Sequence, residues 1–118
     1  MRFMLIVQNP AGARPPEGDH EDLAAGMAAL LEEMAQSGVL LDTAGLRPVD
    51  EAVRIHLSGG RQTVVNGPFA ESKEFVGGYC LLQARSLDEA MHWASRFLAL
   101  HQGDWEMSME IRQLDDRA

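Results

Sequence analysis

The stretch VVNGPFAESKEFVGGYCLLQARSLDEAMHWA, residues 64–94, carries the local signals that decide the fold. Its Gly77-Gly78 pair indicates a β-bulge or a close approach of backbone or ligand, and the apolar residues 79–84 predict a strand. The SLDE sequence that follows is a capping box, in which the Ser86 oxygen accepts from the third helical amide and Glu89 reaches back. Apolar side chains then recur on one helical face. The stretch therefore predicts a loop, a strand and a helix in that order.

The flanking sequence adds further elements on both sides of this stretch. An N-cap at Asp19 and a stop at Gly38 enclose an amphipathic helix, and a Gly-Gly turn joins two alternating runs into a hairpin with one wet face. This order of strands and helices predicts an α+β fold, with two helices on one face of an antiparallel sheet. A second subunit would be an economical cover for the other face. The remaining predicted strands are residues 3–7, 39–46, 53–58, 62–65 and 105–112.

Length, charge and cysteine content restrict the class of protein. The 118 residues suit a single domain, residues 1–118, that buries a core without disulfides or a metal. A formal net charge of −8 without a Lys or Arg block argues against nucleic acid and anionic membranes as partners. Cys80 is the only cysteine, and we find no leader or long apolar run, so we expect a cytoplasmic protein. No two histidines have metal-ligand spacing, so no metal site is predicted.

Nearly the whole chain resembles the YCII-related proteins of the DGPF type, whose motif reads Asp-Gly-Pro-Phe-Ala-Glu-Thr-Lys-Glu before a Gly-Gly-aromatic strand and an Asp-Glu-Ala helix. Two positions depart from it, because Asn66 and Ser72 stand where the family has Asp and Thr. The resemblance implies a ferredoxin-like sheet of the dimeric α/β-barrel type, in which two sheets face each other. It also implies a link to sigma factors of the extracytoplasmic-function type. The matching positions are Gly67, Pro68, Phe69, Ala70, Glu71, Lys73, Glu74, Gly78, Tyr79, Leu87, Asp88, Glu89 and Ala90.

The loop that begins at Asn66 contains several candidate site residues, each with a plainer alternative. Asn66 and the following Gly-Pro suit a tight turn, in which Asn tolerates a positive φ and Gly supplies it; the family Asp could instead accept a proton. Phe69 either walls a pocket or anchors the loop in the core. Glu71 and Lys73 form either a proton-transfer group beside a substrate or a solvated loop with weak ion pairs.

The C-terminal part of the chain adds three candidates, and all of them match the ending of the family pattern. Glu110 and Arg112 stand two apart on a predicted strand and share a face, where an Arg fork between two sheets can hold a carboxylate. His101 is the best acid/base candidate, because a reference pKa of about 6.5 suits proton transfer at neutral pH. A His at a helix C-terminus is also favourable simply through the helix dipole.

Two functions are compatible with these residues. The first is a small-molecule acid/base enzyme without a cofactor, whose site lies in the cleft at the interface of a homodimer. There His101 or Glu71 moves the proton, and Arg112 holds an anionic group of a small polar or anionic organic ligand. The alternative is a non-catalytic small-molecule-binding or accessory protein linked to sigma-factor regulation, which Asn66 favours because an amide does not take up a proton as a carboxylate does. The predicted ligand-binding residues are Asn66, Phe69, Lys73, Tyr79, Glu110 and Arg112.

Overall fold

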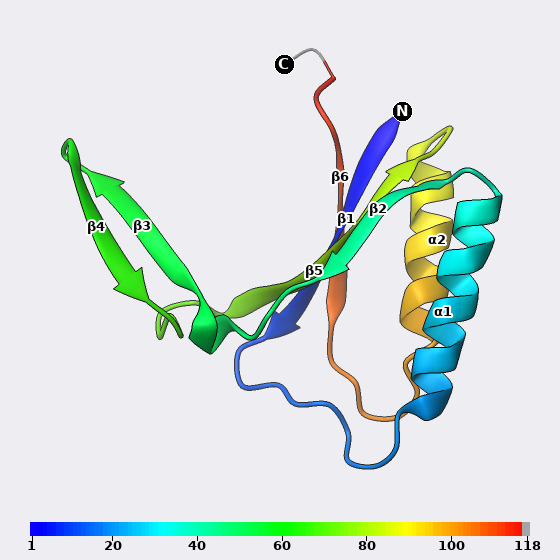
Figure 1. The fold of residues 1–118 in the computed structure, drawn as a ribbon, viewed down its shortest axis with the longest axis horizontal. Coiled ribbons are helices and arrows are strands. Elements are labelled where there is room, and N and C mark those ends of the chain that lie inside the picture. The colour runs from blue at the N-terminus through cyan, green and yellow to red at the C-terminus, as the bar shows by residue number, and fades with distance from the viewer. Residues whose placement is uncertain (117–118) are drawn as a thin grey trace.

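A computed structural model describes residues 1–116, which form a body with one projecting arm (Figure 1). The body is a four-stranded antiparallel sheet in the order β2-β5-β1-β6, with both helices on one face. The arm, residues 53–66, is the hairpin β3–β4, a separate two-stranded sheet. This architecture confirms the α+β prediction and is consistent with a ferredoxin-like fold. The elements are β1 (Arg2–Pro10), α1 (Glu21–Gln36), β2 (Leu40–Gly45), the 3-10 turn η1 (Val49–Glu51), β3 (Val53–Ser58), β4 (Arg61–Asn66), β5 (Glu74–Gln83), α2 (Leu87–Ala99) and β6 (Ser108–Gln113).

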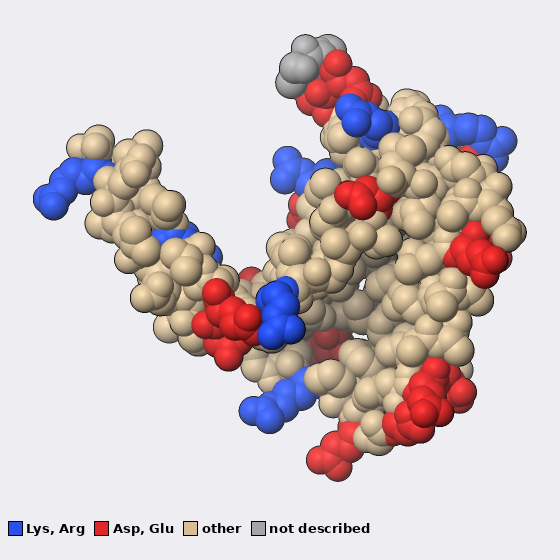
Figure 2. All heavy atoms as spheres, viewed as in Figure 1, with Lys and Arg blue, Asp and Glu red and all other residues tan. Residues whose placement is uncertain are grey.

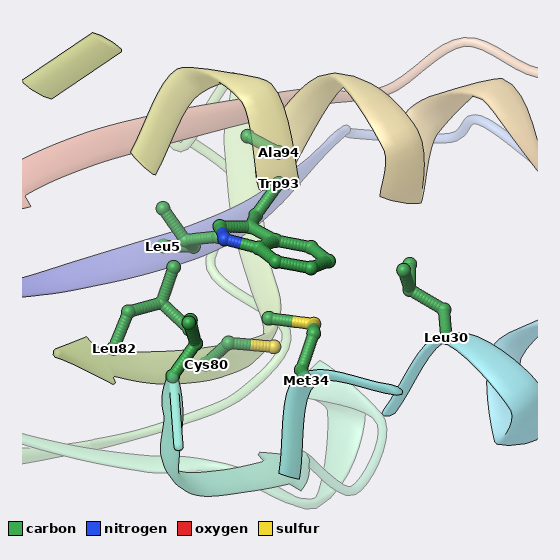
Figure 3. Packing of buried hydrophobic residues seen from close by; sticks show 8 residues of the cluster. Leu5, Leu30, Met34, Cys80, Leu82, Trp93 and Ala94 are labelled. Carbon is green, nitrogen blue, oxygen red and sulfur yellow. The ribbon is translucent and has the colours of Figure 1, made fainter. Parts of the chain in front are cut away.

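The core of the body lies between the sheet and the helices, and it follows from the alternation of side chains along each strand. Phe3 and Leu5 of β1 pair with Leu82 and Cys80 of β5, and these side chains are buried. Full burial of one large apolar side chain contributes about 1.5–3 kcal/mol. The helices cover this surface with Leu30, Met34, Trp93 and Ala94, as Figure 3 shows.

The start of α2 confirms half of the predicted capping box. The Ser86 Oγ accepts from the Glu89 N–H at 3.2 Å, as the sequence predicts. The Glu89 carboxylate does not reach back to the cap, because it accepts from the Arg85 Nε at 2.5 Å instead. The Ser86 cap alone therefore satisfies one of the amides that a helix N-terminus leaves unpaired.

Helix α1 begins one residue later than the sequence predicts. The N-cap is His20, whose side chain makes no cap hydrogen bond. The predicted cap, Asp19, still satisfies an amide at this end, because its Oδ1 accepts from the Glu21 N–H at 2.9 Å. The carboxylate thus acts from one residue before the cap, where a negative charge also suits the helix dipole.

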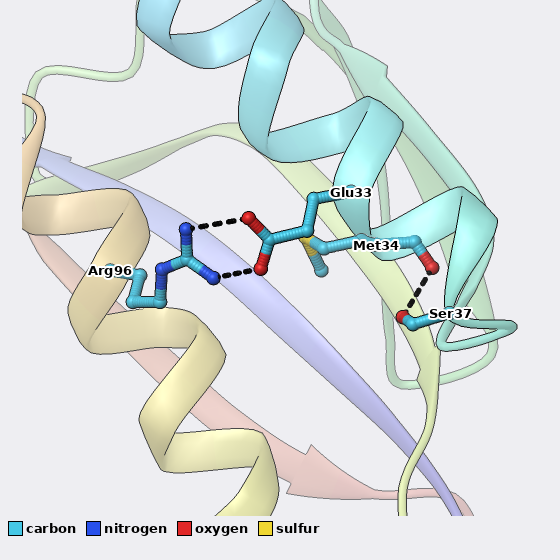
Figure 4. A network of polar contacts seen from close by, with 4 residues as sticks. All are labelled: Glu33, Met34, Ser37 and Arg96. Carbon is cyan, nitrogen blue, oxygen red and sulfur yellow. Dashed lines mark hydrogen bonds and ion pairs between the residues drawn. The ribbon is translucent and has the colours of Figure 1, made fainter.

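A hydrogen-bonded ion pair joins the outer surfaces of the two helices. The Arg96 guanidinium of α2 donates through both Nη atoms to the Glu33 carboxylate of α1, and Ser37 donates to the Met34 carbonyl at 3.0 Å (Figure 4). The hydrogen bonds from Arg96 lower the pKa of Glu33. Both side chains are about half exposed, so the ion pair orients the helices rather than supplying much of the stability.

Three strands differ clearly from their predicted bounds. Strand β1 continues to Pro10, not only to residue 7, because its last residues pair with the start of β5. Strand β5 begins at Glu74, not at residue 79. A bulge opposite Val7 and Gln8 accommodates the Gly-Gly pair, so the residues of β5 before this pair continue to pair with β1. Strand β6 begins at Ser108, not at residue 105. Trp105 packs its ring against His101 and His20 instead, with centroid separations of 5.1 and 5.4 Å.

The arm has the predicted hairpin geometry, but both of its faces are exposed to solvent. Its turn places Gly59 and Gly60 at φ values of 58° and 77°, a region that glycine adopts without strain. Ile55 pairs with Val64, so the two side chains share a face, whereas Arg54 lies on the opposite, polar face. The expectation of one wet face is wrong for the single chain, because every arm residue is exposed on both faces.

Candidate functional site

The body contains a cavity of about 520 Å³ between the sheet and the helices, at the end where β1 and β2 finish. Figure 2 shows the body hollowed between these two layers. Its polar side chains are few and include Asn9, Thr43 and His101. A mainly apolar concave site with a few polar groups is the usual form of a small-molecule site. The apolar lining side chains are Val7, Met27, Leu31, Phe97 and Met107.

His101 enters this cavity immediately after the end of α2. Its N–H donates to the Leu98 carbonyl at 3.0 Å, and its Nδ1 lies 3.1 Å from the Phe97 carbonyl oxygen. Because a carbonyl only accepts, Nδ1 carries the proton in this hydrogen bond. The neutral ring then keeps an unprotonated Nε2. The Phe97 and Trp105 rings lie 5.3 and 5.1 Å from the His101 ring centroid, so aromatic contacts hold it in place.

Gly77 and Gly78 form part of the cavity wall, and a side chain would meet the end of the Asn9 side chain at Gly77 and backbone at Gly78. A Cβ at Gly77 would lie 2.6 Å from the Asn9 Nδ2, and one at Gly78 would lie 2.8 Å from the Ala44 carbonyl oxygen. Both interpretations of this pair, a bulge and a close approach of backbone, are therefore confirmed. The glycines leave main chain, rather than side chains, exposed to the cavity.

Cys80 and Thr43 close the sheet side of the cavity. The Thr43 Oγ1 donates to the Tyr79 carbonyl at 2.9 Å and lies 3.2 Å from the Cys80 Sγ. Burial raises the pKa of the Cys80 thiol, which the contact with Thr43 offsets only in part. The thiol is therefore neutral at physiological pH and poorly suited to act as a nucleophile.

Tyr79, Glu110 and Arg112 lie on the open face of the sheet, the face that no helix covers. The Tyr79 hydroxyl donates to the Asp42 Oδ2 at 2.7 Å, and this hydrogen bond raises the pKa of Tyr79. The Arg112 Nε and the Glu110 Oε2 are 3.8 Å apart. Ile111, between them, packs into the core, so Glu110 and Arg112 share the opposite face as the alternation predicts.

Phe69, Glu71 and Lys73 lie at the base of the arm. Phe69 is 7% exposed, which supports the anchor interpretation, and the Arg54 guanidinium lies 3.8 Å from its ring centroid. Arg54 also pairs with Glu71, through Nη1 and Oε1 at 3.1 Å. Lys73 is exposed, and its carbonyl accepts from the Ala11 N–H at 2.8 Å. Arg54 is not among the predicted site residues, because no local pattern shows that an Arg on the polar side of a hairpin has a partner beyond the next loop.

Asn66 ends β4 opposite Val53, and the turn after it differs from the expected one. No residue other than glycine has a positive φ within residues 1–116, and Gly67 is not among the glycines that do. The Gly67–Pro68 peptide is cis. Gly67 is required for a different reason: a Cβ there would collide with the Val49 carbonyl oxygen of η1.

The predicted site residues therefore occupy three places rather than one. His101 lies in the cavity under the helices, three candidates lie on the open face, and the rest lie at the arm base. Within the described part of the chain, no hydrogen bond or ion pair joins His101 to Glu71 or Arg112. In residues 1–116 we also find no cluster of His, Cys, Asp and Glu that could hold a metal ion, and no helix long and apolar enough to span a membrane.

Comparison with known proteins supplies the family. Residues 1–112 match the YCII-related domain. An uncharacterised protein of Rhizobium meliloti (strain 1021) is 34% identical over 96 residues, which cover 80% of this chain and 77% of that protein. The match extends over the strands, helices and arm that frame the cavity and the open face. The chain belongs to the YCII-related domain family.

Proposed function

We propose that the protein is a small-molecule acid/base enzyme whose site is the cavity between the sheet and the helices. The observation that best supports this proposal is the hydrogen bond from the His101 Nδ1 to the Phe97 carbonyl, which leaves Nε2 as the proton acceptor. The cavity has the volume of a small-ligand site, and its lining favours a mainly apolar molecule with one polar group. This assignment moves the proton-transfer step from the predicted interface cleft to the interior of one subunit.

The chemistry that suits such a site is removal of a proton from a carbon next to a carbonyl group. His101 Nε2 would accept the proton, and the side-chain amide of Asn9 is the donor in the lining that could orient the carbonyl, because the Thr43 hydroxyl already donates to the Tyr79 carbonyl. Because apolar side chains make up the rest of the lining, they would exclude water from the reacting atoms.

The alternative, a non-catalytic small-molecule binder, is favoured by one feature of the same cavity. None of its described lining residues is a carboxylate, so no acidic side chain there stabilises a positively charged imidazole ring. Asn66 does not supply an acidic side chain either, because it lies at the base of the arm, where β4 ends. The link to sigma-factor regulation belongs to this alternative.

A proposed homodimer would give the open-face residues a different role from that of His101. If two sheets face each other, Tyr79, Glu110 and Arg112 lie at the interface, where the guanidinium could bind a carboxylate of the partner or of a small anionic ligand. Glu71, Lys73 and Asn66 would then border that interface from the arm base.

Hydrogen–deuterium exchange into a panel of small ketones tests the enzyme proposal. Incubation in D₂O, followed by NMR of the ketone, reports proton removal whatever reaction step follows it. We expect His101→Gln to slow any exchange by about 10² or more, since general-base catalysis contributes about 10²–10⁴. His92→Gln is the matched control, because His92 lies on α2, which ends just before His101, but is exposed outside the cavity.

Three outcomes are informative. Exchange that depends on His101 but not on His92 supports the enzyme. Ketones that shift amide resonances of the cavity lining without exchange support the binder. Exchange that survives His101→Gln unchanged would overturn the assignment of the proton acceptor.

A further inference from the structure

The single chain exposes too much surface for its mass. Its accessible surface is 8367 Å² for 13.0 kDa. A compact monomer of this mass exposes about 6,300 Å², so the excess is about 2,000 Å². The radius of gyration, 16.3 Å, likewise exceeds the value of about 13.5 Å for a compact domain of this length. Figure 1 shows the cause, because the arm projects from the body.

The arm has an apolar face that no segment of residues 1–116 covers. Val53, Ile55, Leu57 and Val64 share this face, because Ile55 pairs with Val64 and alternate residues of β3 point the same way. Their exposed fractions are between 61% and 66%. An isolated two-stranded hairpin is marginally stable in water, so a projecting arm of this kind needs support.

The open face of the sheet is a second uncovered apolar surface. Met4 and Ile6 of β1 and Leu81 of β5 alternate with the buried core residues and therefore point away from the helices. Val76, next to the base of the arm, is 46% exposed. The chain thus presents two apolar surfaces, one on the arm and one on the body.

We propose that a second copy of this chain covers the apolar face of the arm, so that the arm of each subunit lies against its partner. A two-fold dimer buries the same surfaces on both subunits, which would account for both uncovered surfaces with one partner. The excess of about 2,000 Å² per chain is well above the roughly 800 Å² per partner of a standard interface. This inference deepens the proposed homodimer, and it does not depend on chemistry in the cavity.

Charge also favours contact between an arm and a second body. The arm, residues 53–66, has Arg54 and Arg61 and no acidic residue, a formal charge of +2. Subtracting these two from the 10 basic residues leaves eight against 18 acidic ones, a formal charge of −10 for the rest of the chain. Two bodies repel each other at long range, whereas an arm and a body attract.

Matched variants on neighbouring positions of β4 test this contact. Val64→Glu places a charge on the apolar face of the arm, whereas Thr63→Glu places the same charge on the polar face. We expect light scattering of the unmodified protein at micromolar concentration to give twice 13.0 kDa. We expect Val64→Glu to raise the dissociation constant of the dimer about 100-fold or more, and Thr63→Glu to change it by less than about 5-fold, since each factor of ten is 1.4 kcal/mol.

Amide hydrogen exchange of the arm provides an independent readout. Protection of residues 53–66 should increase with protein concentration over the range in which the mass doubles, while protection of the core strand β5 should not. A monomer at high concentration would refute the homodimer and this inference together. A stable dimer with equal affinity for both variants and an unprotected arm would refute only the role of the arm.

Discussion

The body and the arm are both built from strands with alternating apolar side chains, yet their environments are opposite. On β5 the alternation places Leu82 at 0% exposure beneath the helices, whereas on β3 it places Leu57 at 66%. The difference arises because the described residues form a helical layer over one face of the body and none over the arm. Alternation therefore determines which side chains share a face, and the rest of the structure determines whether that face is buried.

The largest expected difference between the two regions is in the cost of removing one leucine side chain. Leu82→Ala should lower the free energy of unfolding by about 2–5 kcal/mol, because the site is closed on all sides. Leu57→Ala should change it by no more than about 0.5 kcal/mol when the chain is monomeric. Urea unfolding at low protein concentration measures both. A large loss for Leu57→Ala under those conditions would mean that the arm packs on its own body.

The junction between the two regions should show a smaller but clear effect. Gly67→Ala should cost about 1–3 kcal/mol, because the added methyl group collides with the Val49 carbonyl and the backbone must move. Gly45→Ala is the matched control, since a Cβ there has no other atom within 4 Å. It should be neutral or stabilising by up to about 1 kcal/mol through the unfolded state.

Thermal unfolding of these two glycine variants decides the point. Equal melting temperatures would show that the arm base tolerates a side chain, and that the contact between Gly67 and η1 does not fix the arm.

The smallest expected effect is a spectroscopic one on the open face of the body. Tyr79 is the only tyrosine, so its ionisation can be followed directly by ultraviolet absorbance. The hydrogen bond to Asp42 raises its pKa, so the phenol should ionise above its ordinary value of about 10. Asp42→Asn should lower that pKa toward the ordinary value, whereas Asp50→Asn on η1 should not change it.

The same shift has a defined sign for stability. The folded chain holds the phenolic proton more tightly than the unfolded chain. This contribution to stability is therefore complete below the ordinary pKa and is lost as the pH rises through the pKa of the folded state. An unchanged titration curve for Asp42→Asn would show that the pair does not persist in solution.

Local sequence patterns predict most elements of the body but not the cavity that forms the candidate site. The Ser86 cap and the face shared by Glu110 and Arg112 depend on residues close together in the chain, and the Gly-Gly pair is itself a local signal for the bulge. Strand β5 begins earlier than the local pattern predicts, because its first residues pair with the end of β1. That pairing joins segments far apart in sequence, which local patterns do not report.

The sequence by itself determined the α+β class, the positions of both helices, the hairpin with its glycine turn and the family pattern. These depend on periodicity, capping and turn residues, which act over a few positions. Only the tertiary structure decided that His101 lies in a cavity away from Glu71, that Arg54 covers Phe69, and that the arm stands clear of the body. The physical reason is that burial and contact depend on which segments meet in space, and the same alternating strand is a core in one place and an exposed surface in another.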